Sequence, residues 1–200
     1  MRRRTFDAVM VAAGLALAVV LVVAGVLLTW GHNFVSSEVR SQLAAQKIVF
    51  PPAASDAVTT LPKADAAAMR VYAGQEMTTG AQAQAYADHF IAVHLAEIGG
   101  GLTYSQLSAK AMADPGNTKL ADQVATVFKG TTLRGMLLNA YGFWQMGQIA
   151  LIGAIAAFAG AALMLILSLA GAWHLRRTPA TAEVFAKVTH PETQPETQPV

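Results

Sequence analysis

The chain has 200 residues, of which 54% are apolar and only 13% are charged, and its net charge is +2. Ordinary globular domains are about 25% charged, so this composition indicates membrane segments rather than one large soluble core. The small net charge and the lack of a basic stripe argue against a nucleic-acid partner. The absence of cysteine excludes disulfides, thiolate catalysis and cysteine metal ligands.

Residues 1–7 carry three arginines, and an apolar stretch follows over residues 8–30. The apolar region of a secretory signal peptide is usually about 7–15 residues long and ends at a small-residue cleavage site. Here the stretch is longer and runs into Thr29, Trp30 and Gly31 without such a site. We therefore expect an uncleaved transmembrane helix over residues 8–30.

A second apolar stretch, over residues 146–173, contains no charged residue and is followed by Arg176 and Arg177. About 20 apolar residues suffice to cross a bilayer. Arginines precede the first stretch and follow the second. The positive-inside rule therefore places both termini in the cytoplasm. Residues 31–145 are then extracytoplasmic, and the plasma (inner) membrane is the expected location.

The middle segment predicts helices and turns in alternation. Glycines at 99–101 and the Asp-Pro-Gly-Asn turn at 114–117 separate helices. Threonines precede several of them as candidate N-caps. We expect helices over residues 33–47, 63–75, 80–98 (capped by Thr79), 103–113 and 119–129, and a last one, capped by Thr131 or Thr132, that continues into the second span. Residues 174–200 are expected to be a disordered cytoplasmic tail, because a Pro/Glu/Thr/Gln repeat cannot bury a core.

The predicted fold class is therefore all-α, with two transmembrane helices flanking an extracytoplasmic helical bundle domain. Within it, His89 and His94 are the closest pair of histidines. On an α-helix, positions five apart diverge by roughly 140°, so these two do not form a helical zinc site. No nucleophile elbow or phosphate loop is present, and neither span carries an ionisable residue at mid-depth. We predict no catalytic residue, no metal and no cofactor.

Small residues recur at helical spacing in both spans. Such residues let membrane helices approach closely. The candidate helix-packing residues are Gly14, Ala18 and Gly25 in the first span and Gly153, Ala157 and Gly160 in the second. They indicate either packing of the two spans on each other or contact with a partner, including a second copy of the chain.

One aromatic and amide face precedes the second span. Tyr141, Trp144, Gln145 and Gln148 recur at i, i+3, i+4 and i+7 of a helix. Tryptophan and tyrosine are typical both of the membrane interface and of protein-binding hot spots. These four residues form either an interfacial belt or a candidate docking surface for a partner.

Three segments carry a family resemblance: RRRTFD at residues 2–7, YAGQ with TTGAQAQAYADHFIAVHL within residues 72–95, and TLRGMLLNAYGFWQ at residues 132–145. Over roughly residues 1–177 the chain resembles a family of actinobacterial two-span membrane proteins. Some of its members are labelled as subunits of an aromatic ring-opening dioxygenase. Because that chemistry uses iron held by two histidines and a carboxylate, and no matching triad is present, the resemblance implies a topology and no functional residue.

The sequence thus favours a non-enzymatic integral membrane protein, acting as an envelope scaffold or as an accessory subunit of a membrane complex. Its partners would be membrane lipid and a protein partner or a second copy of itself. The alternatives are a membrane-anchored enzyme working outside the membrane and a small transporter or channel component.

Overall fold

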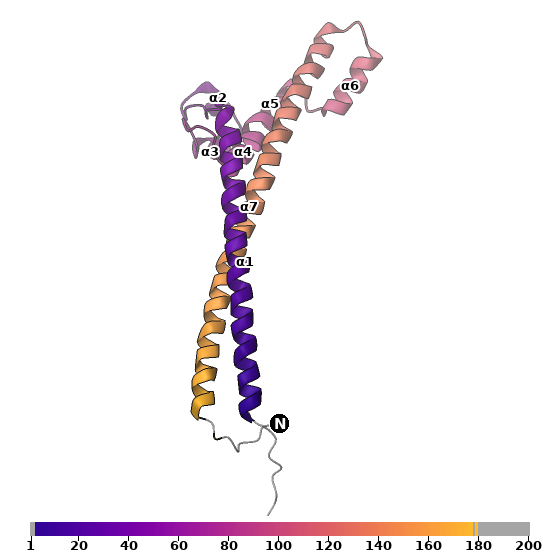
Figure 1. Ribbon diagram of the computed structural model, residues 1–200. Helices are drawn as coiled ribbons and strands as arrows, with labels where there is room; N and C mark the ends of the chain where they lie inside the picture. The colour runs from indigo at the N-terminus through magenta and orange to yellow at the C-terminus, as the bar shows by residue number, and fades with distance from the viewer. Residues whose placement is uncertain (1–2, 178, 180–200) are drawn as a thin grey trace, which may run out of the picture. The chain divides into compact units, whose positions relative to one another are not determined.

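The computed structural model describes residues 3–177 and 179, and the described chain is helical with no strand. A single isolated antiparallel bridge joins Val49 and Glu76. The elements, labelled in Figure 1, are α1 Arg3–Ala45, α2 Asp56–Thr59, α3 Lys63–Arg70, α4 Gly80–Tyr86, the π-helical turn η1 Ala87–Ile91, α5 Ala92–Ile98, α6 Tyr104–Ala113 and α7 Thr118–Arg177. The all-α prediction is confirmed for this part of the chain.

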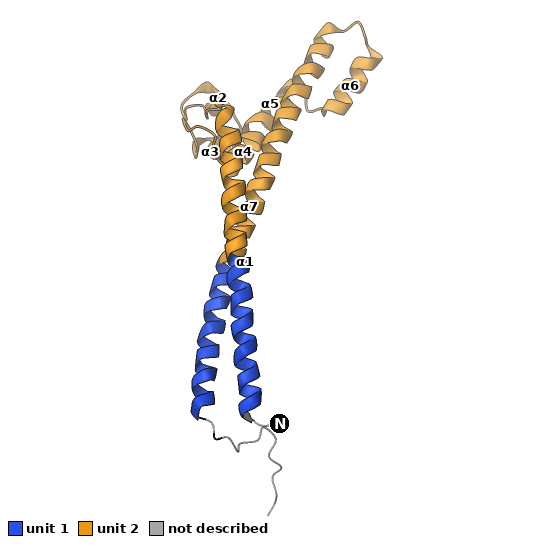
Figure 2. Cartoon of the chain, viewed as in Figure 1, with its two compact units in different colours: residues 1–25, 155–200 blue, residues 26–154 orange. Residues whose placement is uncertain are grey.

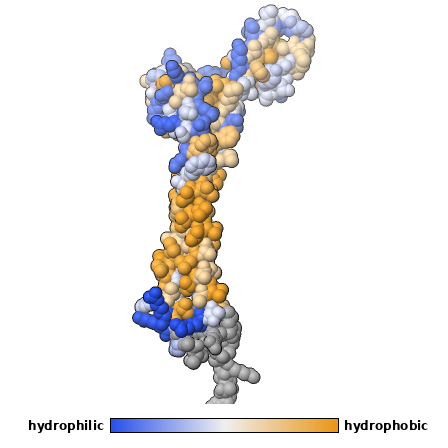
Figure 3. All heavy atoms as spheres, in the orientation of Figure 1, coloured by the Kyte–Doolittle hydropathy of each residue, from blue (hydrophilic) through white to orange (hydrophobic). Residues whose placement is uncertain are grey.

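Helices α1 and α7 are both long and apolar enough to cross a membrane. The most apolar 18-residue windows of α1 and α7 have mean hydropathies of 2.9 and 2.5, and only 11% of each window is buried. The core helix of a soluble protein is mostly buried, so the low burial distinguishes these two helices from that class. Apolar side chains cover the parts of α1 and α7 that the sequence predicts as spans (Figure 3).

The chain divides into two compact units (Figure 2): residues 1–25 with 155–200, and residues 26–154. In the first unit α1 and α7 run antiparallel, since a Cβ on Gly171 would lie 3.0 Å from Val11, and one on Gly160 would lie 3.3 Å from Leu21. A Cβ on Gly25 would lie 2.9 Å from the Phe158 ring. Glycine therefore stands where the other helix places a larger side chain.

From residue 154 onward, the most buried positions of α7 follow a seven-residue repeat. Ala154 and Ala161 are each 2% exposed, and Ser168 is 5% exposed. A seven-residue repeat is typical of left-handed helix packing. Of the residues singled out in the sequence, Ala18 and Ala157 are buried, and Gly153 faces Leu28 within the second unit.

The second unit has its own hydrophobic core, to which α1 contributes Val39 and Leu43 and α7 contributes Leu137. The segment between the two long helices supplies the rest: Phe50, Val58, Leu61, Ala66, Met69, Met77, Ala83, Ala87 and Ile91. Since Phe50, Met69, Met77 and Val58 are completely or almost completely buried, the segment is a packed domain built onto α1 and α7.

The predicted helix starts at Thr79 and Thr103 are confirmed. Each threonine caps its helix by accepting a hydrogen bond from the backbone N–H three residues later, at Gln82 and Gln106. Each glutamine side chain in turn accepts a bond from the threonine N–H, which completes a capping box. The glycines at 99–101 follow the end of α5, where Gly100 and Gly101 have positive φ.

The helix expected over residues 80–98 begins and ends at the expected residues, since α4 starts at Gly80 and α5 ends at Ile98. It contains a π-helical turn at Ala87–Ile91 that the sequence did not predict. A boundary expected before the second span is wrong. The second helix start, expected at Thr131 or Thr132, does not exist, because α7 is continuous and is capped by Asn117, whose Oδ1 accepts from the Leu120 N–H at 3.0 Å. Helix α7 also includes residues 174–177, which the sequence assigned to the tail. The remainder of that tail lies outside the described residues, except Pro179.

Replacing Gly160 with leucine tests the close contact in the first unit. The new side chain would collide with Leu21, whereas leucine at the exposed Ala162 would not. Overpacking typically costs about 1–3 kcal/mol. Thermal unfolding in mild detergent should show a clear loss of stability for Gly160→Leu and little change for Ala162→Leu. Equal behaviour of the two variants would mean that this contact contributes nothing to stability.

Candidate functional site

The aromatic and amide face at Tyr141, Trp144, Gln145 and Gln148 is divided by the fold. Trp144 is partly buried and packs against the start of α4, where a Cβ on Gly80 would lie 2.6 Å from the Trp144 Cγ. The ring of Tyr141 lies 6.3 Å from that of Trp144, centroid to centroid. Gln145 is exposed, and Gln148 is half-buried. Trp144 is thus occupied by the chain's own domain, and Gln145 is the most accessible of the four.

A polar contact joins α1 and α7 in the second unit. The Nδ1 atom of His32 lies 2.9 Å from the carbonyl oxygen of Gly147. A Cβ on Gly147 would lie 3.5 Å from Val35, so the two helices are also in close van der Waals contact there. This side-chain bond to a helical carbonyl fixes the two backbones next to each other.

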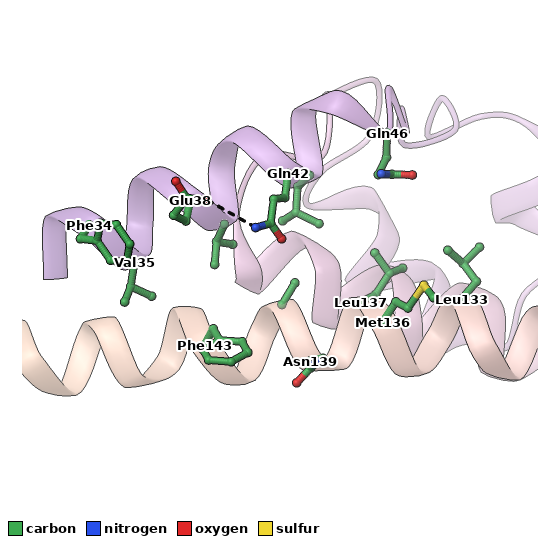
Figure 4. Close-up of a pocket in the computed structure, with 13 residues that line it drawn as sticks. Phe34, Val35, Glu38, Gln42, Gln46, Leu133, Met136, Leu137, Asn139 and Phe143 are labelled. Carbon is green, nitrogen blue, oxygen red and sulfur yellow. Dashed lines mark hydrogen bonds between the residues drawn. The ribbon is translucent and has the colours of Figure 1, made fainter. Parts of the chain in front are cut away.

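Beyond this contact lies an open groove between α1 and α7, with a volume of about 520 Å³ (Figure 4). We call it the α1–α7 groove. One wall comes from α1 and Gln46, and the other from α7. Its lining residues are Phe34, Val35, Glu38, Val39, Gln42, Leu43, Gln46, Leu133, Met136, Leu137, Asn139, Ala140 and Phe143.

The groove has a buried floor and an exposed apolar rim. Val39, Leu43 and Leu137 form the floor and belong at the same time to the domain core. At the rim, Phe34 is 56% exposed and Met136 is 65% exposed. Large apolar side chains exposed together are typical of a surface that binds something.

Among the described residues that line the groove, only Glu38 is ionisable. It lies on the α1 wall, where Gln42 Nε2 donates to Glu38 Oε2 at 3.4 Å (Figure 4). The other polar lining residues are the neutral amides Gln46 and Asn139. The groove therefore offers an apolar binding surface and no cationic side chain.

The histidines of the domain make separate contacts. His89 Nδ1 lies 2.7 Å from Asp65 Oδ1, which joins η1 to α3, and His94 Nδ1 lies 2.8 Å from the carbonyl oxygen of Phe90. In the described part of the chain, no three His, Cys, Asp or Glu side chains are grouped so as to hold a metal ion. The nearby pair of Arg134 and Asp88, with nitrogen and oxygen 2.7 Å apart, ties α7 to η1.

A run of ring contacts explains the conformation around η1. Phe50 contacts both Tyr72 and Tyr86, Tyr86 contacts Phe90, and Phe90 contacts His94, with centroids 4.5 to 5.3 Å apart. Burial raises the pKa of Tyr86 above its ordinary value. These rings pack the domain, and their arrangement points to a structural role.

A second pocket, of about 460 Å³, lies between α1 and α7 in the first unit, and Asp7, Ser168 and His174 are among its lining residues. Asp7 Oδ2 is buried with no hydrogen-bond partner in the described part of the chain. These three residues were not singled out in the sequence, since Asp7 lies far from the other two along the chain.

The α1–α7 groove was also missed in the sequence. On α1 its rim residues Phe34, Glu38 and Gln42 recur every four positions, which is the spacing of one helix face, and Gln46 follows just after the helix ends. That pattern was visible, but it did not reveal that the matching face of α7 stands opposite.

No family model, curated protein or solved structure matches the chain.

The contact between Gly80 and Trp144 is testable by a matched pair of glycine substitutions. Alanine at Gly80 would overlap the Trp144 side chain and should destabilise the protein by about 1–3 kcal/mol. A Cβ on Gly142 would meet open space, and alanine there should stabilise helix α7 by up to about 1 kcal/mol. Thermal unfolding in detergent should therefore shift in opposite directions. A neutral or stabilising Gly80→Ala would contradict the packing of Trp144 on α4.

Proposed function

We propose that the protein is a non-enzymatic integral membrane protein that crosses the plasma (inner) membrane twice and presents its helical domain outside the cytoplasm. In this proposal, α1 and α7 are the spans, both termini are cytoplasmic, and the domain binds a protein partner at the cell envelope. It would act as a scaffold or as an accessory subunit of a membrane complex.

The observation that carries this proposal is the combination of two poorly buried apolar helices with a packed domain between them. The apolar windows of α1 and α7 have almost no cover from the rest of the chain. Lipid is the environment in which such helices are stable. The flanking arginines, three before α1's apolar stretch and two at the end of α7, support the orientation.

The scaffold part of the proposal is supported by surface chemistry. Large apolar side chains are exposed on the domain, including Phe128 at 54%, Met136 at 65% and Phe143 at 53%. A soluble domain that acts alone rarely leaves such residues grouped in water. The exposed Gln145 and one wall of the α1–α7 groove lie on the same helix as these residues, which places candidate contacts along α7.

The topology can be tested directly, because the chain has no cysteine. Single cysteines at Thr5 and Thr178 should resist a membrane-impermeant thiol reagent in intact cells, while one at Ser55 should react. After permeabilisation all three should react, which controls for their accessibility. Labelling of Thr178 but not Ser55 in intact cells would reverse the proposed orientation.

The scaffold role predicts a specific neighbour. A photoreactive amino acid at exposed Gln145 should give a covalent product with one defined protein in native membranes, and the same residue at exposed Lys63 should not. Mass spectrometry identifies the covalent products from each position, and comparing them separates specific docking from random collision. Products of the same pattern from both positions, or from neither, would argue against a partner at this surface.

A further inference from the structure

The α1–α7 groove is a mainly apolar site with no occupant from the described part of the chain. Its floor of Val39, Leu43 and Leu137 is held by the domain core, with exposed fractions of 6%, 4% and 3%. The rim residues Phe34 and Met136 are exposed, and Figure 4 shows the side chains of both walls. Exposed apolar surface is unfavourable in water, so a ligand that covers it gains binding energy.

We propose that this groove holds a single acyl chain of a lipid from the adjacent leaflet of the membrane. The inference rests on the proposed function, since it requires α1 and α7 to be embedded in a bilayer. It extends that function by assigning a lipid-binding site to the domain itself.

Exposed apolar side chains lie next to the groove on both helices of the second unit. On α1, exposed Val26, Leu27 and Trp30 lead toward the groove, and the Trp30 ring stacks on that of Phe34 at 5.7 Å. On α7, exposed Ile149 and Met146 lead to Phe143. Both approaches end at residues that line the groove, so an acyl chain reaches it without crossing a charged surface.

The position of the groove along α1 also favours a lipid. Trp30 is the residue expected at the membrane interface, and Phe34 lies one helical turn beyond it. About 20 Å of helix separates Trp30 from Leu43, at roughly 1.5 Å per residue. The groove therefore begins in the headgroup layer and extends away from the bilayer. Its lower end lies next to the acyl chains of the lipids.

The charge of the lining decides which part of a lipid the groove accepts. Within residues 3–177 no lysine, arginine or histidine lines it, so a phosphate or a free carboxylate finds no cation from this part of the chain. Glu38 would repel an anionic headgroup. The site thus recognises the chain rather than the headgroup, and it favours lipids with no net charge over anionic lipids.

The test uses the full-length protein in phosphatidylcholine vesicles that carry a photoreactive diazirine near the end of one acyl chain. After irradiation, labelled peptides are mapped by mass spectrometry. We expect labels on the groove walls, within residues 34–46 and 133–143, as well as on both spans. In matched vesicles, a phosphatidylglycerol probe should label the groove less than the phosphatidylcholine probe, and Glu38→Gln should remove that difference.

A matched pair of methionine substitutions controls for surface effects. Met136 lines the groove, and Met112 is similarly exposed, at 73%, but does not line it. Met136→Glu should reduce groove labelling about tenfold, because a carboxylate is costly beside an apolar chain. Met112→Glu should leave it unchanged. Both variants alter exposed residues, and span labelling reports whether each remains inserted.

The outcomes separate this inference from the proposed function. Labelled spans with an unlabelled groove would overturn the acyl-chain site and leave the membrane topology standing. Unlabelled spans would refute membrane insertion itself. Equal groove labelling in the Met112→Glu and Met136→Glu variants would mean nonspecific adsorption. A covalent product between two copies of the chain through the groove would assign the groove to a second copy. Either result overturns the inference.

Discussion

The close approach of α1 and α7 is the constraint on which both units depend. In the first unit it is permitted by Gly160 and Gly171, and in the second by Gly147 and Gly153, each of which faces an apolar side chain of α1. In the proposed membrane setting there is little hydrophobic drive between two helices, so close van der Waals packing has to supply the attraction. Larger side chains at these four positions would separate the helices and remove the framework for the domain.

The domain and the groove are two consequences of the same arrangement in the second unit. Beyond the bond between His32 and the Gly147 carbonyl, the facing positions carry larger residues such as Val39, Leu43 and Leu137. The core of the domain packs against these residues. The same three side chains also form the floor of the α1–α7 groove, so its shape is tied to the stability of the core.

Local signals made much of the helical structure predictable. The helix starts at Thr79 and Thr103 depend on contacts within four residues, and the long apolar stretches follow from composition. The π-helical turn at Ala87–Ile91 was not predictable in this way, because no local signal marks its extra residue. The ring contacts of Phe50 and Phe90 with Tyr86 come from the folded domain.

The same distinction applies to the candidate sites. A straight helical wheel at 100° per residue selected Gly153 and Gly160, whereas the most buried positions are Ala154 and Ala161. Both pairs are seven residues apart, so the spacing alone does not decide which of two adjacent positions is the more buried. The groove was missed because it needs the faces of two helices that are far apart in sequence.

The two long helices come from opposite ends of the sequence, and this has a consequence for biosynthesis. Gly14 meets Ser168, and Val39 shares a core with Leu137, so neither the helix pair nor the domain is complete until most of the chain has been made. Contacts between such distant residues carry a large loop-closure cost and form slowly. The segment between the two helices emerges from the ribosome before α7, which completes the core of the domain, has been synthesised. Helix α7 therefore acts as the closing element of folding, and a nascent chain that stops before it has neither a finished core nor a paired α1.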